Sequence, residues 1–339
     1  MILDYSGKLI LAPMVRTGEL PTRLLALRYG ADLVWSPEIV DKKIIGCKRI
    51  YNDKLNCIDF VKVPSNTLVF RTHAVKEHGR LIFQLGSASP DLAVAAAKVV
   101  VGDVAGIDLN SGCPKHFSIH SGMGAALLKT PDKLVAILES LVEQIGKPHN
   151  IGISVKIRIL ETPEETFTLV RRLVATGISA LTVHCRKTYM RPREAPLREH
   201  FLKEIAQICR DAGVTCIANG GITCKDEMEA MTENYGVDSC MLAQAPEKNL
   251  SCFRSSEEGG ELPALEVATS YFDIAREVDN ALPNTKFCLL KTIPGNMKDI
   301  FKKVAQAKSF GDIAVALGAD EPECTVQELH RKRVQSLLS

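Results

Sequence analysis

The chain has 339 residues, of which 46% are apolar and 24% charged, a balance typical of a globular protein with room for one large domain and a smaller one. Its 42 basic and 40 acidic side chains give a net charge of +2, which neither indicates nor excludes nucleic acid as a partner. The 11 cysteines are never spaced C-x-x-C, which argues against a disulfide framework or a zinc site.

No apolar run reaches the length of a membrane span, and residues 1–5 carry neither a basic flank nor a long apolar core. The cysteine spacing also favours free thiols, as in a reducing compartment. Together, these features predict a cytoplasmic and/or nuclear protein. We expect a monomer with no metal and no membrane contact.

Short apolar runs alternate with helix-spaced runs along the first 250 residues. The first run, 8–12, stops at Pro13 and is followed by Leu20, Leu24 and Leu27 at helical spacing. The predicted strands cover residues 8–12, 32–35, 81–85, 104–110, 151–157, 180–184, 214–218 and 238–242. The predicted helices cover residues 20–30, 39–48, 90–101, 132–144, 164–176, 200–211 and 225–233. Residues 57–61 and 67–71 predict an inserted hairpin.

Eight such units favour a (β/α)8 TIM barrel over an open doubly wound sheet. The absence of a G-x-G-x-x-G segment after a strand argues against a Rossmann domain. Strand patterns end near Gly259 and Gly260, and helices are predicted at 262–280, 296–307, 311–317 and 325–338. We therefore predict a barrel domain at 1–255 and a small all-α helical domain at 260–339.

The segment 108–115 (DLNSGCPK) is the most informative stretch of the chain. Gly112 and Pro114 end the fourth strand and leave Cys113 on a turn, with Asn110 beside it and a glycine-rich run at 121–126. A lone intracellular cysteine is usually a small buried hydrophobe. Here its position favours a reactive thiol.

Polar residues stand at the carboxyl ends of five predicted strands, where the working residues of such barrels lie. They are Gln84, Asn110, Lys156, Arg158, His184 and Asn219. Lys156 and Arg158 alternate with apolar residues and face the same way, so they either bind an anionic ligand or pair with Asp108 and other carboxylates. His184 is either a site residue or a satisfied core imidazole.

Asn219, Gly220 and Gly221 follow the seventh strand, where barrels often hold a phosphate on bare backbone N–H groups. A phosphate cradle, a deep cation and opposing amide side chains suit flavin mononucleotide (FMN). Lys156 would stabilise negative charge on the pyrimidine end of the reduced flavin, and Gln84 and Asn110 would contact its carbonyl and N–H edges.

The motifs of this chain, taken in sequence order, resemble those of the flavin-dependent tRNA-dihydrouridine synthases. The matching segments are 11–14 (LAPM), Pro21-x-Arg23, Glu38, 83–86 (FQLG), 108–115, 122–128 (GMGAALL), Lys156-x-Arg158, 183–186 (VHCR) and 219–221 (NGG). Residues 284–288 (NTKFC) resemble the eukaryotic subgroup that modifies position 20 of the D-loop.

The resemblance implies FMN- and NADPH-dependent reduction of a D-loop uridine in tRNA. Hydride would pass from the reduced flavin to carbon 6, and Cys113 would give a proton to carbon 5 as general acid; a thiol pKa of about 8.5 suits that role. The implied flavin ligands are Pro13, Met14, Val15, Gln84, Asn110, Lys156, His184, Asn219, Gly220, Gly221, Ala243 and Gln244. The family usually has arginine where this chain has Gln244, so a phosphate-pairing cation is either missing or supplied elsewhere.

The substrate tRNA requires a basic surface around the barrel mouth, because the target uracil has to leave its stack. We predict contacts from Lys115, Arg158, Arg186, Lys286, Lys291, Lys298 and Lys302. Lys291, Lys298 and Lys302 share one face if their helix is continuous, although Pro294 and Gly295 interrupt the pattern. A solvated lysine-rich face is the alternative.

Two other functions remain open from sequence. One is a flavin-dependent dehydrogenase of a free pyrimidine, in which similar Asn-x-x-Cys-Pro turns occur. The other is a non-catalytic tRNA-binding protein that retains the barrel.

Overall fold

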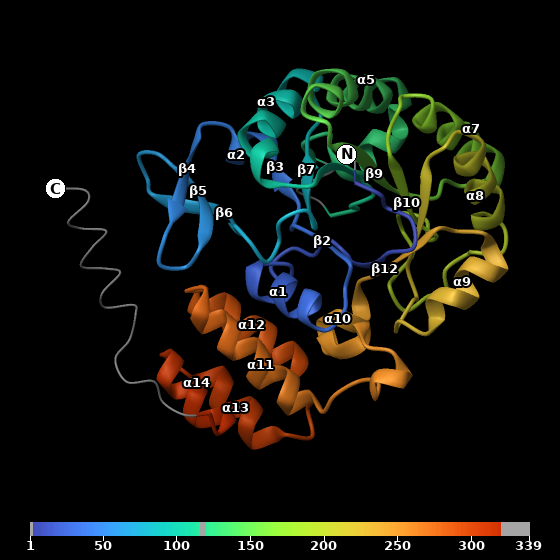
Figure 1. Ribbon diagram of the computed structural model, residues 1–339. Coiled ribbons are helices and arrows are strands. Elements are labelled where there is room, and N and C mark those ends of the chain that lie inside the picture. The colour runs from blue at the N-terminus through green and yellow to red at the C-terminus, as the bar shows by residue number, and fades with distance from the viewer. Residues whose placement is uncertain (1–2, 116–119, 320–339) are drawn as a thin grey trace.

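The computed structural model describes residues 3–115 and 120–319, so the helix predicted at 325–338 lies outside the described residues. Eight parallel strands close into a barrel, because β2 pairs with both β1 and β7 (Figure 1). The ring strands are β1 (Leu9–Leu11), β2 (Leu33–Trp35), β7 (Leu81–Gly86), β8 (Gly106–Ser111), β9 (Gly152–Arg158), β10 (Ala180–His184), β11 (Thr215–Asn219) and β12 (Ser239–Leu242). The predicted (β/α)8 barrel is confirmed.

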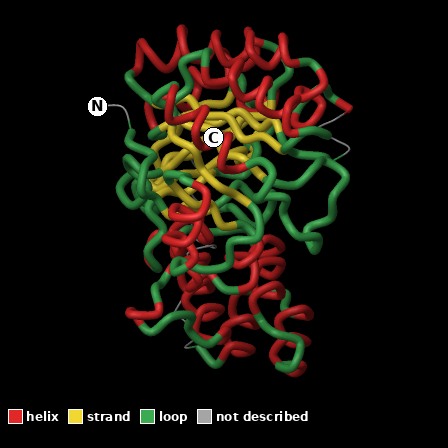
Figure 2. The backbone as a smooth tube through the Cα atoms, turned by 90° about the vertical axis from the view of Figure 1, so that its right-hand side faces the viewer, coloured by secondary structure: helices red, strands yellow, loops and turns green. Residues whose placement is uncertain are grey.

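Helices surround the strands, as the red layer outside the yellow strands shows in Figure 2. They are α1 (Leu20–Arg28), α3 (Pro90–Val100), α5 (Pro131–Leu141), α7 (Pro163–Val174), α8 (Leu202–Asp211), α9 (Glu227–Tyr235) and the short α10 (Gln244–Lys248). Their starts follow from local sequence. Proline occupies the first turn of α3, α5 and α7, where its missing N–H costs nothing, and Thr162 with Glu165 forms a capping box on α7.

The amino end of the barrel is packed shut. Tyr5 lies against Gly106 and Gly152, the first residues of β8 and β9, and a Cβ at Gly152 would lie 2.7 Å from Cε2 of Tyr5. The Tyr5 and Trp35 ring centroids are 6.3 Å apart. The apolar cluster around them contains Ile10, Leu33, Ile82, Ala180, Ile217 and Met241. Polar side chains are therefore concentrated at the opposite, carboxyl end.

The segment after β2 differs from the prediction. In place of a helix at 39–48, the chain forms β3 (Ile39–Val40), the one-turn helix α2 (Asp41–Ile44) and the start of β4 (Cys47–Asn52). β4 pairs with β5 (Cys57–Lys62), which pairs with β6 (Thr67–His73), so the predicted hairpin is a three-stranded antiparallel sheet. Apolar spacing could not reveal β4, because its Ile50 and Tyr51 are exposed and its order comes from pairing with β5.

The helical region contains α11 (Ala264–Glu277), α12 (Leu282–Thr292), α13 (Lys298–Gln306) and α14 (Phe310–Leu317), drawn orange to red in Figure 1. The helix α12 was not predicted as a separate element. Pro294 and Gly295 separate it from α13, so the continuous helix that would place Lys291, Lys298 and Lys302 on one face does not form. In the described part of the chain, no helix is long and apolar enough to cross a membrane.

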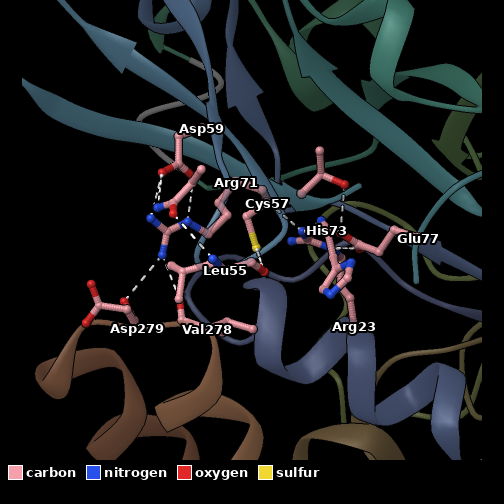
Figure 3. Close-up of polar contacts among 11 residues, drawn as sticks. Arg23, Leu55, Cys57, Asp59, Arg71, His73, Glu77, Val278 and Asp279 are labelled. Atoms are coloured by element: carbon pink, nitrogen blue, oxygen red, sulfur yellow. Dashed lines mark hydrogen bonds and ion pairs between the residues drawn. The ribbon is translucent and has the colours of Figure 1, made fainter. Parts of the chain in front are cut away.

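A polar network joins the inserted sheet to α1 and to the helical region (Figure 3). Arg71 on β6 binds both carboxylate oxygens of Asp59 at 2.5 and 2.7 Å, and its Nη1 donates to the Val278 carbonyl at the end of α11 at 2.7 Å. The neighbouring Arg23 on α1 is fully buried and pairs with Glu77 at 2.6 Å. These buried charges are paired, which makes the junction between the sheet, α1 and α11 specific.

Candidate active site at the carboxyl end of the barrel

Two adjoining pockets open where the strands end. The larger has a volume of about 550 Å³ and lies beside Gly220 and Gly221, and the smaller, of about 260 Å³, lies beside Cys113. Met14, His184 and Glu247 line both pockets, so the two are parts of one site. The combined volume of the two pockets is within the usual size range for a site that binds a cofactor together with a substrate group.

The floor of the smaller pocket is positively charged. Lys156 and Arg158 project from β9, and neither forms an ion pair with any described residue. Asp108 is completely buried, and its two oxygens accept from Gln84 (2.8 Å) and Ser154 (2.7 Å). Burial raises the pKa of Asp108 to about 6, whereas burial and the nearby Arg158 lower the pKa of Lys156 to about 8. Lys156 is thus available to an anionic ligand, whereas Arg158 already donates to the Gly112 and Lys187 carbonyls through two of its nitrogens.

Cys113 is held on a rigid turn. The Asn110 side-chain oxygen accepts from the backbone N–H groups of Gly112 (3.0 Å) and Cys113 (3.1 Å), and the Cys113 carbonyl accepts from Ala125 N–H (2.9 Å). Arg158 Nε donates to the Gly112 carbonyl at 3.1 Å. Asn110, predicted to contact a flavin, therefore also shapes the turn that presents the thiol.

Burial raises the pKa of the Cys113 thiol, and the negative charge of Glu38 raises it further, while the Lys115 backbone N–H opposes both. A thiol with a raised pKa stays protonated at neutral pH and can donate a proton. This environment is the opposite of that of a thiolate nucleophile, which requires a lowered pKa.

His184 ends β10 and is a neutral imidazole. Arg186 Nη1 lies 2.9 Å from His184 Nε2, and because guanidinium can only donate, Nε2 accepts and the ring proton is on Nδ1. Burial and then the positive charges of Lys156, Arg158 and Arg186 hold the pKa of His184 far below its usual range. The ring lines both pockets, so it is a site residue as well as a satisfied one.

The turn after β11 requires glycine. Gly220 has φ +100°, and a Cβ there would lie 2.5 Å from Cδ2 of His184. Arg198 Nη2 donates to the Gly220 carbonyl at 2.6 Å, which places a guanidinium beside the turn. Arg198 therefore lies behind the predicted phosphate cradle, and Arg186 and Lys248 are the cations that line the pocket beside it.

The two pockets together bring most of the predicted site residues into one place. They line one or both pockets: Pro13, Met14, Val15, Gln84, Asn110, Cys113, Lys115, Lys156, Arg158, His184, Arg186, Asn219, Gly220, Gly221, Ala243 and Gln244. Three lining carboxylates were not predicted as site residues. Glu38 follows β2, so its place at a strand end was a usable signal, whereas Glu247 on α10 and Glu261 before α11 had none.

The four predicted lysines of the helical region lie outside both pockets. Lys286 donates to the Ala307 carbonyl at 2.6 Å, and Lys291 pairs with Glu247 at 2.9 Å. Lys298 and Lys302 are exposed on α13. The condition for placing Lys291, Lys298 and Lys302 on one face, a continuous helix, is not met, and the tRNA contacts of the four lysines stay a prediction.

One face of α12 instead contacts the pocket wall. The carbonyl of Arg16, in the loop after β1, accepts from Asn284 Nδ2 at 2.6 Å, and the Arg16 guanidinium lies 3.7 Å above the Phe287 ring. Arg16 has φ +69°, a backbone conformation that an arginine adopts only when its surroundings impose it. Together with the Lys291–Glu247 ion pair, these contacts attach α12 to the pocket wall formed by Met14 and Val15.

Comparison with known proteins identifies the family of the chain. Residues 10–331 match the family described as Dihydrouridine synthase (Dus). The chain is 53% identical over 319 residues to tRNA-dihydrouridine(20) synthase (NAD(P)+) of Schizosaccharomyces pombe, a match that covers 93% of this chain and 66% of that protein. It is 49% identical over 330 residues to the Saccharomyces cerevisiae protein of the same name, with coverages of 93% and 84%.

A human protein named tRNA-dihydrouridine(20a/20b) synthase (NAD(P)+)-like is 30% identical over 277 residues, covering 81% of this chain and 78% of that one. The chain spans just under two thirds of the length of the fission yeast relative, and the described pockets lie within the matched region.

Proposed function

The chain belongs to the dihydrouridine synthase family, and on that premise we propose that it reduces a uridine of tRNA to 5,6-dihydrouridine, at position 20 of the D-loop. The observation that carries the proposal is the place of the Cys113 thiol, on a turn held by Asn110 in the same pocket as Lys156 and Arg158. The relatives named for position 20 support the choice of uridine.

We propose FMN as the cofactor and NADPH as the reductant. The larger pocket offers the Gly220–Gly221 backbone and the cationic side chains of Arg186 and Lys248 for a phosphate. The smaller pocket offers Lys156 for a negatively charged ring. Lys156 and Arg158 have no carboxylate partner in the described part of the chain, which is the condition expected of side chains that await an anionic group. When bound and reduced, the flavin supplies hydride to carbon 6 of the uracil.

The chain's own residues supply the rest of the reaction. Cys113 gives its proton to carbon 5, and the turn held by Asn110 keeps the thiol directed at one position. Lys156 lowers the energy of negative charge in the pocket, and Arg158 braces both the Cys113 turn and the loop after β10 through the Gly112 and Lys187 carbonyls. The target base has to leave the RNA stack to reach this depth.

The ten described cysteines are all free thiols. We propose that the enzyme works in a reducing compartment, the cytoplasm or the nucleus.

The test is dihydrouridine formation in tRNA from a strain that lacks the corresponding gene, incubated with the protein, FMN and NADPH and read position by position. We expect product at position 20 only. The Cys113→Ala variant should retain flavin and lose about 10²- to 10⁴-fold in turnover, the usual contribution of a general acid. Oxidation of NADPH with free uracil or orotate, and none with tRNA, would identify a small-molecule dehydrogenase instead. Tight tRNA binding with no reduction of any pyrimidine would indicate a binding protein.

A further inference from the structure

The loop between β10 and α8, residues 185–201, has a basic segment that the proposed reaction does not use. Lys187, Arg191 and Arg193 follow Arg186 before the first acidic residue, Glu194. Arg191 and Arg193 are exposed, and neither forms an ion pair within residues 3–115 and 120–319. Such unneutralised, exposed cations attract a polyanion.

Tyr189 stands among these cations. Its side chain is 67% exposed, and Lys187 Nζ lies 5.9 Å from the ring centroid. A single exposed aromatic residue is unremarkable on its own. An exposed ring with a cation at its side and two unpaired arginines two and four residues further along the chain is the combination found on surfaces that bind single-stranded nucleic acid.

The loop that carries Tyr189 is braced by its own contacts. Met190 N–H donates to the Lys187 carbonyl at 3.1 Å and closes a turn around the tyrosine. Arg158 Nη1 donates to the same carbonyl at 2.9 Å, and Arg186 Nε donates to the Glu194 carbonyl at 2.7 Å. Lys187 is fixed by an ion pair with Glu161 at 3.0 Å. A loop backbone held by such contacts loses little freedom when a flat ligand stacks on the ring that it carries.

The bracing residues also belong to the pockets. Arg158 lines the pocket of Cys113, and Arg186 and Pro192 line the larger one, so the tyrosine turn rises from the rim of the site. A uridine that leaves its stack to enter the site deprives a neighbouring base of its stacking partner. A flat aromatic ring at the rim is placed to replace that partner.

We propose that Tyr189 is a stacking platform for a nucleobase next to the uridine that enters the site, and that Arg191 and Arg193 bind the phosphates beside it. This surface deepens the proposed function and rests on it. RNA is favoured over an acidic protein segment because the exposed ring provides a π face and two unpaired arginines follow it in the same loop. The interaction is sequence-tolerant, since every base can stack.

The test compares Tyr189→Ala with Tyr189→Phe, which keeps the ring and removes only the hydroxyl. Binding of tRNA is measured by fluorescence anisotropy, together with the quenching of 2-aminopurine placed on either side of the target uridine. We expect Tyr189→Ala to raise the tRNA Kd roughly tenfold, in line with the loss of one base stack, and to abolish the quenching at one of the two positions. Tyr189→Phe should stay within about twofold and keep the quenching.

Tyr51, 55% exposed on β4 of the inserted sheet, provides a matched control as Tyr51→Ala. Replacing Arg191 and Arg193 by alanine together should reduce the slope of log Kd against log salt by about two. Unchanged affinity and quenching in Tyr189→Ala, an equal loss in Tyr51→Ala, or binding of an acidic peptide in place of RNA would overturn the proposal. If quenching occurs and no dihydrouridine forms with the parent protein, the reaction fails and the binding surface stands.

Discussion

The two sides of the barrel mouth use similar side chains in different ways. On the side of the helical region, Lys291 pairs with Glu247, Lys286 donates to a backbone carbonyl, and Arg16 stacks on Phe287. On the side of the β10–α8 loop, Arg191 and Arg193 have no carboxylate partner among the described residues. Cations that find partners inside the protein position its parts, and those left without partners are available to a ligand.

The largest effect is expected at Arg71, whose partly buried ion pair joins the inserted sheet to the helical region. Arg71→Met leaves the Asp59 carboxylate, only 10% exposed, without its bidentate partner and frees the end of α11. Breaking such a pair costs about 3–5 kcal/mol of folding free energy, which urea unfolding measures. The control is Arg172→Met, whose partner Asp132 is 93% exposed and stays hydrated when the pair is lost, so this variant should cost about 1 kcal/mol or less. Equal losses would mean that burial does not distinguish the two pairs.

The next largest effect is expected at Gly220, in the turn that we propose binds the flavin phosphate. Gly220→Ala combines a φ of +100° with a Cβ 2.5 Å from the His184 ring, a strain of about 1–3 kcal/mol. We expect flavin affinity to fall roughly 5- to 150-fold, measured by flavin fluorescence. Gly213→Ala is the matched control, because Gly213 has φ +69° and nothing within 4 Å of its Cβ position. Full flavin binding by Gly220→Ala would show that the turn is not part of the cradle.

A third prediction concerns the effect of Glu38 on the pKa of Cys113, measured through the pH dependence of thiol labelling and of activity. Its negative charge raises the Cys113 pKa, so Glu38→Gln should lower that pKa and let the thiolate form at lower pH. Iodoacetamide labelling of Cys113 should then rise, and uridine reduction should fall, at a lower pH than in the parent. Glu247→Gln, which removes another pocket carboxylate, should leave the labelling profile in place. A profile that Glu38→Gln does not move would refute this coupling.

The smallest effect concerns the remaining lysines. Lys298 and Lys302 lie four residues apart on α13 and are exposed, so the double alanine variant should reduce the salt slope of tRNA binding by up to about two if α13 touches phosphate. Lys291→Ala should leave the slope unchanged, because Glu247 already neutralises that charge. A reduced slope for Lys291→Ala would contradict this expectation and show that Lys291 also contacts RNA phosphate.

The sequence predicted features that depend on local order. The strand ends that carry Gln84, Lys156 and His184 follow from short apolar runs, and a closed barrel then brings them together. The partners of the lysines could not be predicted, because Glu247 and Lys291 are 44 residues apart and meet only after α12 has docked. The strand β4 was missed for a similar reason, since its order comes from pairing with β5 rather than from its own pattern.

The closed amino end of the barrel has a consequence for the order of events. Among the described residues, Tyr5 and the apolar side chains around it fill that end, so we take the carboxyl-end opening as the common entrance for everything that reacts at the floor. In the proposed reaction, the nicotinamide donor and the RNA both have to reach one flavin through that entrance. They therefore visit in turn, and double-reciprocal plots of initial rate at several tRNA concentrations should run parallel.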